Sequence, residues 1–74
     1  MKIHKTAILS EKVKIGENVE IGPYCIIGEN VEIGEGTSLF SFVQIERNTK
    51  IGKNNKIYGP SHIGFPPQDI SDKR

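Results

Sequence analysis

The chain has 74 residues, and its ten Lys and Arg against nine Asp and Glu give a formal net charge of +1. This balance argues against a nucleic-acid-binding protein, which needs a clustered basic surface, and a single cysteine excludes an internal disulfide framework. Apolar runs are too short for a membrane span or for the apolar part of a signal peptide. We therefore expect one small domain, in which eight Gly and four Pro disfavour long helices.

An aliphatic residue recurs at every sixth position along the chain. Eleven positions follow this period: Ile3, Leu9, Ile15, Ile21, Ile27, Ile33, Leu39, Ile45, Ile51, Ile57 and Ile63. A period of six fits neither the α-helix nor the coiled coil, and such regular repeats are typical of solenoid folds. The residue two positions earlier is mostly small or branched, as at Val13, Val19 and Cys25. Both positions are therefore expected to point inward from one short strand.

The remaining positions of each hexad predict an outward residue and a turn. Between the two inward positions the sequence often carries a charge, as at Lys14 and Glu20. Three positions after the aliphatic residue lie residues that tolerate a left-handed backbone, which predicts a sharp turn there. These turn residues are Asn18, Asn30, Gly36, Asn48 and Asn54.

Three hexads close a triangular coil of 18 residues, so eleven hexads predict between three and four coils. Residues 1–64 are thus expected to form the coils, and residues 65–74 a loop or tail. Phe65-Pro66-Pro67 could cover the open end, because prolines cannot extend a ladder of hydrogen bonds, or two stacks could meet end to end.

One edge of this prism is expected to be apolar, because residues 18 apart should stack directly. Phe40 then lies between Gly22 and Tyr58, and Phe42 lies between Tyr24 and Pro60. The neighbouring outward column runs through Ile8, Ile26, Gln44 and His62. A contiguous apolar surface usually marks an interface. We therefore predict a subunit interface formed by Tyr24, Phe40, Phe42, Tyr58, Ile8 and Ile26.

The hexads resemble those of the hexapeptide-repeat acyltransferases, whose fold is a left-handed parallel β-helix. Residues 3–8, residues 21–28, and Ile63-Gly64 followed by Pro67-Gln68-Asp69 are similar to the N-terminal coils of acyl-carrier-protein–UDP-N-acetylglucosamine O-acyltransferases. The resemblance implies an all-β, left-handed parallel β-helix of about four triangular coils, assembled as a cytoplasmic homotrimer. It also implies transfer of a 3-hydroxyacyl group from acyl carrier protein to UDP-N-acetylglucosamine in lipid A biosynthesis. We expect no cofactor and no metal.

The resemblance also assigns a role to two residues near the end of the chain. Gln68 and Asp69 are expected to bind the nucleotide sugar, because a carboxylate accepts hydrogen bonds from sugar hydroxyls in fixed directions. The family often has a Lys two positions after this Asp, where the chain has Ser71. Its general base is a His on a much later coil. We therefore expect a shortened part of such an enzyme, without a catalytic residue and inactive on its own.

Three other residues have chemically versatile side chains but ordinary expected roles. His62 falls in an outward column and is interpreted as a solvated or interface histidine, and His4 as a residue without a chemical role. Cys25 falls in an inward column and is interpreted as a small buried hydrophobe, since no partner makes it a nucleophile or metal ligand.

Two other functions remain open. The apolar edge and the missing base favour a non-catalytic module for trimerisation or self-assembly. The repeat is also shared with other hexapeptide enzymes, such as sugar N-acetyltransferases, and the chain could be a segment of one of these.

Overall fold

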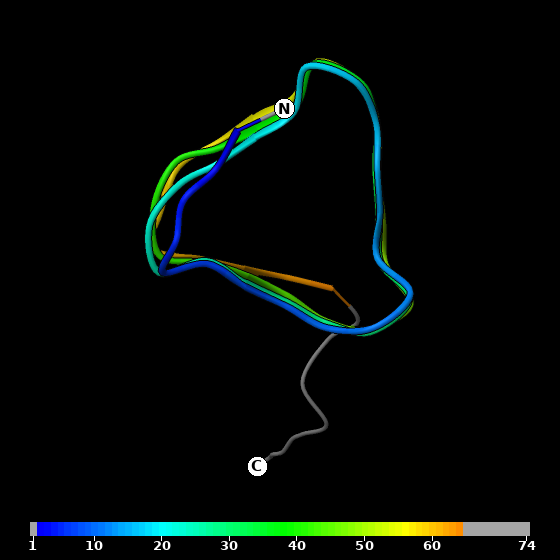
Figure 1. The fold of residues 1–74 in the computed structure, drawn as a ribbon, viewed down its shortest axis with the longest axis horizontal. Helices are drawn as coiled ribbons and strands as arrows, with labels where there is room; N and C mark the ends of the chain where they lie inside the picture. Colours follow the sequence, from blue (N-terminus) through cyan, green and yellow to red (C-terminus); the bar gives the residue numbers. More distant parts are fainter. Residues whose placement is uncertain (1, 65–74) are drawn as a thin grey trace, which may run out of the picture.

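The computed structural model describes residues 2–64, which wind into a three-sided parallel β-helix whose coils overlay in end view (Figure 1). The first wall has the order β1-β4-β7-β10 and consists of β1 (Lys2–Ile3), β4 (Glu20–Ile21), β7 (Ser38–Leu39) and β10 (Lys56–Ile57). The second has the order β11-β8-β5-β2 and consists of β2 (Ile8–Leu9), β5 (Ile26–Ile27), β8 (Val43–Ile45) and β11 (Ser61–Ile63). The third has the order β3-β6-β9 and consists of β3 (Lys14–Ile15), β6 (Glu32–Ile33) and β9 (Lys50–Ile51).

Each strand from β1 to β8 pairs in parallel with the strand 18 residues further along the chain. On the first wall this register places Ile3, Ile21, Leu39 and Ile57 in one vertical file. Two walls of four strands and one of three, within residues 2–64, give between three and four coils. The predicted fold class and the predicted 18-residue stacking are both confirmed.

The core is the column of side chains that point inward from the three walls. Its buried apolar members are Val19, Ile21, Cys25, Ile27, Val31, Ile33, Leu39, Val43 and Ile45. Equivalent residues in the outer coils, such as Leu9 and Ile51, are only partly buried. Ile3, which the period places inside, is 42% exposed, because it lies in the first coil and has a neighbouring coil on one side only.

The turns confirm the left-handed backbone predicted for the Asn and Gly column. Its φ angles are 59° at Asn18, 61° at Asn30 and 75° at Gly36. The same conformation occurs at Lys12, Tyr24 and Phe42, with φ angles of 62°, 59° and 55°. A left-handed conformation costs an ordinary residue about 1–2 kcal/mol. The closed coil therefore imposes this conformation even on residues that do not favour it.

Thr37 is the one polar residue that is fully buried among residues 2–64. Its hydroxyl donates a hydrogen bond to the Gly52 carbonyl oxygen at 2.7 Å and accepts one from the Asn55 N–H at 3.2 Å. One side chain thus ties the segment before β7 to the turn before β10. The bonds explain why a hydroxyl is tolerated inside the apolar column.

Replacing Thr37 by Val should destabilise the fold by about 1–3 kcal/mol, because the shape is kept while two hydrogen bonds of buried groups are lost. Urea unfolding followed by far-UV circular dichroism measures this change. Thr49→Val is the matched control: the Thr49 hydroxyl makes one exposed bond, 3.3 Å from the Arg47 carbonyl oxygen. Its loss should cost less than about 0.5 kcal/mol. Equal unfolding midpoints for the two variants would contradict the role given to Thr37.

The net charge of successive coils alternates in sign, although Glu29 and Glu35 also each have a Glu 18 positions earlier. The coil formed by residues 20–37 carries four Glu and no Lys or Arg. Each of these Glu has a basic residue 18 positions away in a neighbouring coil. The resulting pairs are Glu20 with Lys2, Glu29 with Arg47, Glu32 with both Lys14 and Lys50, and Glu35 with Lys53. On the walls, where the strand register sets Glu20 beside Lys2 and Glu32 beside Lys14 and Lys50, such opposite charges stabilise the stacked strands modestly, by about 0.2–1 kcal/mol each.

Candidate functional site

The corner between the first and second walls differs in composition from the other two corners. Its turns are residues 4–6, 22–24, 40–42 and 58–60, and they carry every aromatic residue within the described range 2–64. The other corners are built from segments such as Gly-Glu-Asn at residues 16–18 and 28–30. We call the first corner the aromatic corner and define it by Tyr24, Phe40, Phe42 and Tyr58.

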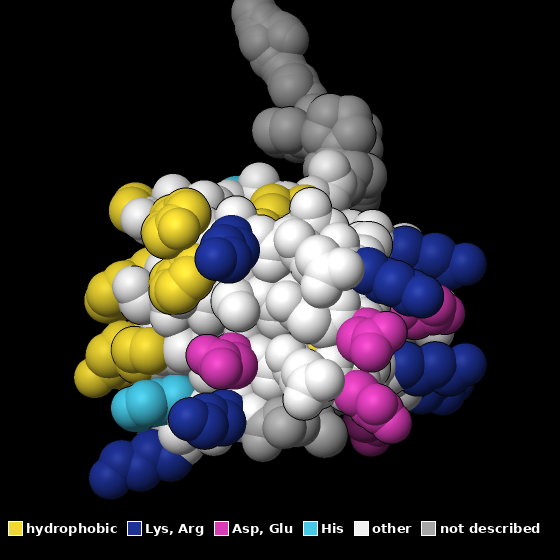
Figure 2. Space-filling view, turned by 90° about the horizontal axis from the view of Figure 1, so that it is seen from above, with side chains coloured by type: hydrophobic (Ala, Val, Ile, Leu, Met, Phe, Trp, Pro, Cys, Tyr) yellow, Lys and Arg dark blue, Asp and Glu magenta, His cyan; other side chains and the backbone are white. Residues whose placement is uncertain are grey.

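The four rings form two stacked pairs, as the 18-residue spacing predicts. The ring centroids of Phe40 and Tyr58 are 4.5 Å apart with an interplanar angle of 4°, and those of Tyr24 and Phe42 are 5.2 Å apart at 16°. All four side chains remain between 39% and 64% exposed. Figure 2 shows the hydrophobic column on one side of the molecule, while most charged side chains gather on the opposite side.

Thr6 fixes the backbone of Tyr24 from the coil below. The Tyr24 N–H donates a hydrogen bond to the Thr6 hydroxyl at 2.9 Å, and the Thr6 N–H donates to His4 Nδ1 at 3.2 Å. On another corner the equivalent donor, the Asn30 N–H, bonds a backbone carbonyl oxygen instead, that of Glu11 at 3.1 Å. The period of six does not indicate this support. The sequence does place Thr6, which has a hydroxyl, 18 positions before Tyr24, a residue type that does not favour a left-handed backbone.

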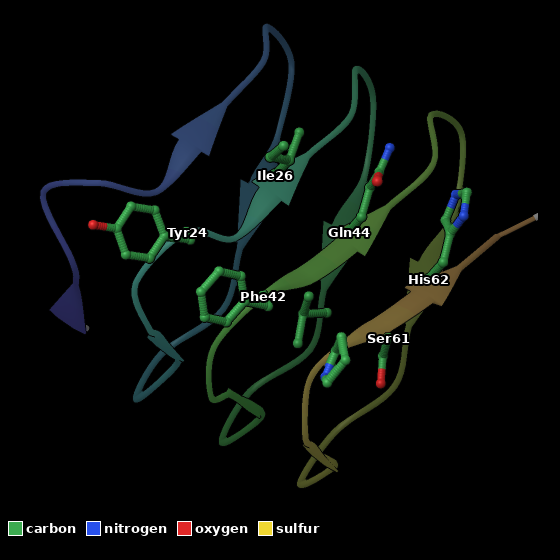
Figure 3. A pocket seen from close by; sticks show the side chains of 8 residues that line it. Tyr24, Ile26, Phe42, Gln44, Ser61 and His62 are labelled. Carbon is green, nitrogen blue, oxygen red and sulfur yellow. The ribbon is translucent and has the colours of Figure 1, made fainter.

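A groove of about 470 Å³ runs beside the aromatic corner along the second wall (Figure 3). Tyr24, Ile26 and Phe42 make its apolar end. Gln44, Ser61 and His62 make its polar end. Ile8 pairs in register with Ile26 and is also exposed, so the predicted apolar column exists. All six residues predicted to form a subunit interface are thus exposed on one face, and their contact with another subunit stays a prediction.

His62 points outward, as predicted, and its Nε2 atom pairs with the Glu46 carboxylate. The pair does not follow from the 18-residue stacking, because the two residues are 16 positions apart and belong to different columns. The neighbouring Ser61 hydroxyl donates its hydrogen bond to the Tyr58 carbonyl oxygen rather than to His62. The groove therefore offers binding groups, but it does not align a serine nucleophile with a histidine base.

The other candidate residues add no reactive group to this face. Cys25 is buried with a free thiol, in agreement with the prediction. Gln68 and Asp69 lie outside the described residues, so their role stays a prediction. Within residues 2–64, no three His, Cys, Asp or Glu side chains group as a metal site would require. The same stretch contains no helix long and apolar enough to cross a membrane.

Comparisons with known proteins agree with the fold. A family model described as bacterial transferase hexapeptide (six repeats) matches residues 2–39. An acyl-(acyl-carrier-protein)–UDP-N-acetylglucosamine O-acyltransferase of Thermodesulfovibrio yellowstonii is 60% identical over 72 residues, which cover 97% of this chain and 28% of that protein. Proteins of the same name are 68% identical in Aliarcobacter butzleri and 52% identical in Rickettsia peacockii, over 92% and 89% of this chain. The matches cover 26% and 25% of those two proteins, so the chain spans about a quarter of the relatives' length.

Proposed function

The chain belongs to the bacterial transferase hexapeptide family, and on this basis we propose that it forms N-terminal coils of an acyltransferase. The reaction is the transfer of a 3-hydroxyacyl group from acyl carrier protein to UDP-N-acetylglucosamine, in the cytoplasm, as a step of lipid A biosynthesis. The observation that supports this proposal is the 60% identity to an enzyme of that name over nearly the whole chain.

The proposed role of these coils is to carry part of the sugar-nucleotide site. Gln68 and Asp69 follow the last described strand, β11, within a few residues. A carboxylate that accepts hydrogen bonds from sugar hydroxyls contributes about 1.5–3 kcal/mol of binding, because one partner is charged. The general base and the remaining contacts belong to other coils of the family. The chain alone should therefore show no turnover.

A chimera tests this function. We expect the Thermodesulfovibrio yellowstonii enzyme to keep its acyl transfer activity when this chain replaces the segment that it matches. In that chimera, Asp69→Ala should lower kcat/KM by roughly 10- to 100-fold, the value of one charged hydrogen bond. Asp72→Ala, which removes the carboxylate three positions later in the sequence, should change kcat/KM less than about twofold. A folded but inactive chimera, or acyl transfer by the chain alone, would contradict the proposal.

We also propose that three copies associate through the aromatic corner and the apolar column beside it. The supporting observation is that the large exposed apolar residues gather there, whereas the other two corners carry charged side chains. Such a patch favours burial against another surface. Sedimentation equilibrium on the chain should give a trimer, and a monodisperse monomer at micromolar concentration would contradict this. A trimer combined with an inactive chimera would instead favour the alternative function, a non-catalytic assembly module.

A further inference from the structure

The aromatic corner contains a gap one ring wide. Its column on the side of the first wall runs through His4, Gly22, Phe40 and Tyr58 in successive coils. Tyr58 covers one face of the Phe40 ring, and Gly22 offers no side chain to the other face. A notch of about 250 Å³ lies there, with His4, Gly22 and Phe40 among its lining residues.

The coil that contains Gly22 cannot fill this gap with a side chain of its own. A Cβ atom at Gly22 would lie 1.5 Å from the Phe40 carbonyl oxygen, so only glycine fits. The layers of His4 and Phe40 are two strand spacings apart, about 9.6 Å. This separation is close to twice the 4.5 Å between the stacked rings of Phe40 and Tyr58. One further ring, stacked under Phe40, would fill the gap.

We propose that this ring is Tyr24 of a second copy of the chain, inserted over Gly22 between His4 and Phe40. The inference deepens the proposed association and rests on it. Tyr24 lies in the same layer as Gly22 but on the other side of the aromatic corner, and its side chain is 57% exposed. When copies are related by rotation about an axis parallel to the axis of the β-helix, equivalent coils of the copies lie at the same height. The second-wall side of one corner then faces the first-wall side of the next, which brings Tyr24 opposite the gap.

The chemistry of the notch matches a tyrosine. The Phe40 ring gives it one apolar face, the outward residues Lys2, Glu20 and Ser38 also line it, and Glu20 and Ser38 can bond a phenolic hydroxyl. Buried tyrosines commonly combine an apolar ring contact with such a bond. Phe42, the other exposed ring on that side, lies one layer away, level with Phe40.

The charge pattern favours this corner over the other faces for level copies. Copies in register place their acidic second coils, residues 20–37, at the same height, so contact through the charged corners would oppose like charges. The turns of the aromatic corner carry only Lys5 as a permanently charged side chain within the described residues. Association through this corner therefore keeps the charged corners of the acidic second coils of neighbouring copies apart.

Cross-linking between differently substituted copies tests the insertion. A mixture of His4→Cys and Tyr24→Cys chains, treated with a short thiol-to-thiol cross-linker, should give a covalent heterodimer, whereas neither chain alone should cross-link efficiently. The matched control pair, Ser10→Cys with Asn30→Cys, occupies the equivalent positions of the corner between the second and third walls and should not cross-link. The unsubstituted chain reports any reaction of Cys25, which is buried.

Variants of Tyr24 provide a second measurement that does not depend on a cross-linker. Tyr24→Leu should weaken self-association roughly tenfold, as expected for an aromatic anchor, while Tyr24→Phe keeps the ring and should weaken it less. Each variant should keep the far-UV circular dichroism spectrum of the unsubstituted chain, which is the check that it is folded. Efficient cross-linking of Tyr24→Cys chains to one another would show that the Tyr24 positions of two copies lie side by side. That result would overturn the proposed insertion of Tyr24 over Gly22 but not the proposed association of copies. Absence of any association overturns both.

Discussion

Gly22→Ala should destabilise the chain strongly, whereas Gly52→Ala should leave it folded. Both glycines follow the inward aliphatic residue of a hexad, and neither has a left-handed φ angle. At Gly22 an added Cβ would meet the Phe40 carbonyl oxygen at 1.5 Å, and this atom belongs to the backbone of the neighbouring coil. At Gly52 the nearest atom is Asn55 Nδ2, at an ordinary contact distance of 3.5 Å. A difference in stability between the two variants therefore reports steric crowding between coils and not strain of the backbone φ angle.

We expect Gly22→Ala to lower the free energy of unfolding by about 3 kcal/mol or more, because the two backbones must separate. Gly52→Ala should change it by less than about 1 kcal/mol, in the stabilising direction, since alanine restricts the unfolded chain. Thermal and urea unfolding by far-UV circular dichroism measure both. If the two variants unfolded at the same midpoint, the close approach of the coils at Gly22 would be wrong.

Ile27→Ala should cost the fold about 2–5 kcal/mol, the usual loss when a fully buried branched side chain leaves a cavity. Ile27 is 0% exposed at the centre of the column, while its neighbour Ile26 in β5 is 43% exposed. Because the chain is small, such a loss can remove the cooperative unfolding transition altogether. The measurement is urea unfolding at a protein concentration low enough to suppress association.

Ile26→Ala is the matched control from the same strand. Under those dilute conditions it should change the free energy of unfolding by less than about 0.5 kcal/mol. At higher concentration it should weaken self-association, because Ile26 lines the groove beside the aromatic corner. A large effect of Ile26→Ala on the dilute chain would mean that this side chain supports the fold rather than a contact between copies.

The period of six was sufficient to predict most of the architecture, because one inward file repeats every 18 residues. The stacking of Phe40 on Tyr58 follows from that spacing alone. The left-handed backbone at Tyr24 and Phe42 does not, since residue propensity opposes it and only closure of the coil requires it. Propensity is a local property, whereas closure is a property of the whole coil.

Contacts that cross between columns could not be predicted in the same way. The pair of Glu46 with His62 joins a corner to a wall, and the bond from the Thr37 hydroxyl to the Gly52 carbonyl oxygen joins residues 15 positions apart. Each depends on side-chain length and direction, which a repeat period does not encode. The exposed apolar face was predictable because its residues are consecutive members of vertical columns.

The alternation of charge between coils has a consequence for how the chain finds its register during folding. Because the hexads are so alike, a strand could pair one coil too far along, with its aliphatic residues still inside. On the third wall, such a slip would set Lys14 beside Lys50 instead of beside Glu32. Like charges side by side disfavour that arrangement. The charge of the acidic coil thereby favours pairing with the coils directly before and after it over a pairing shifted by one coil.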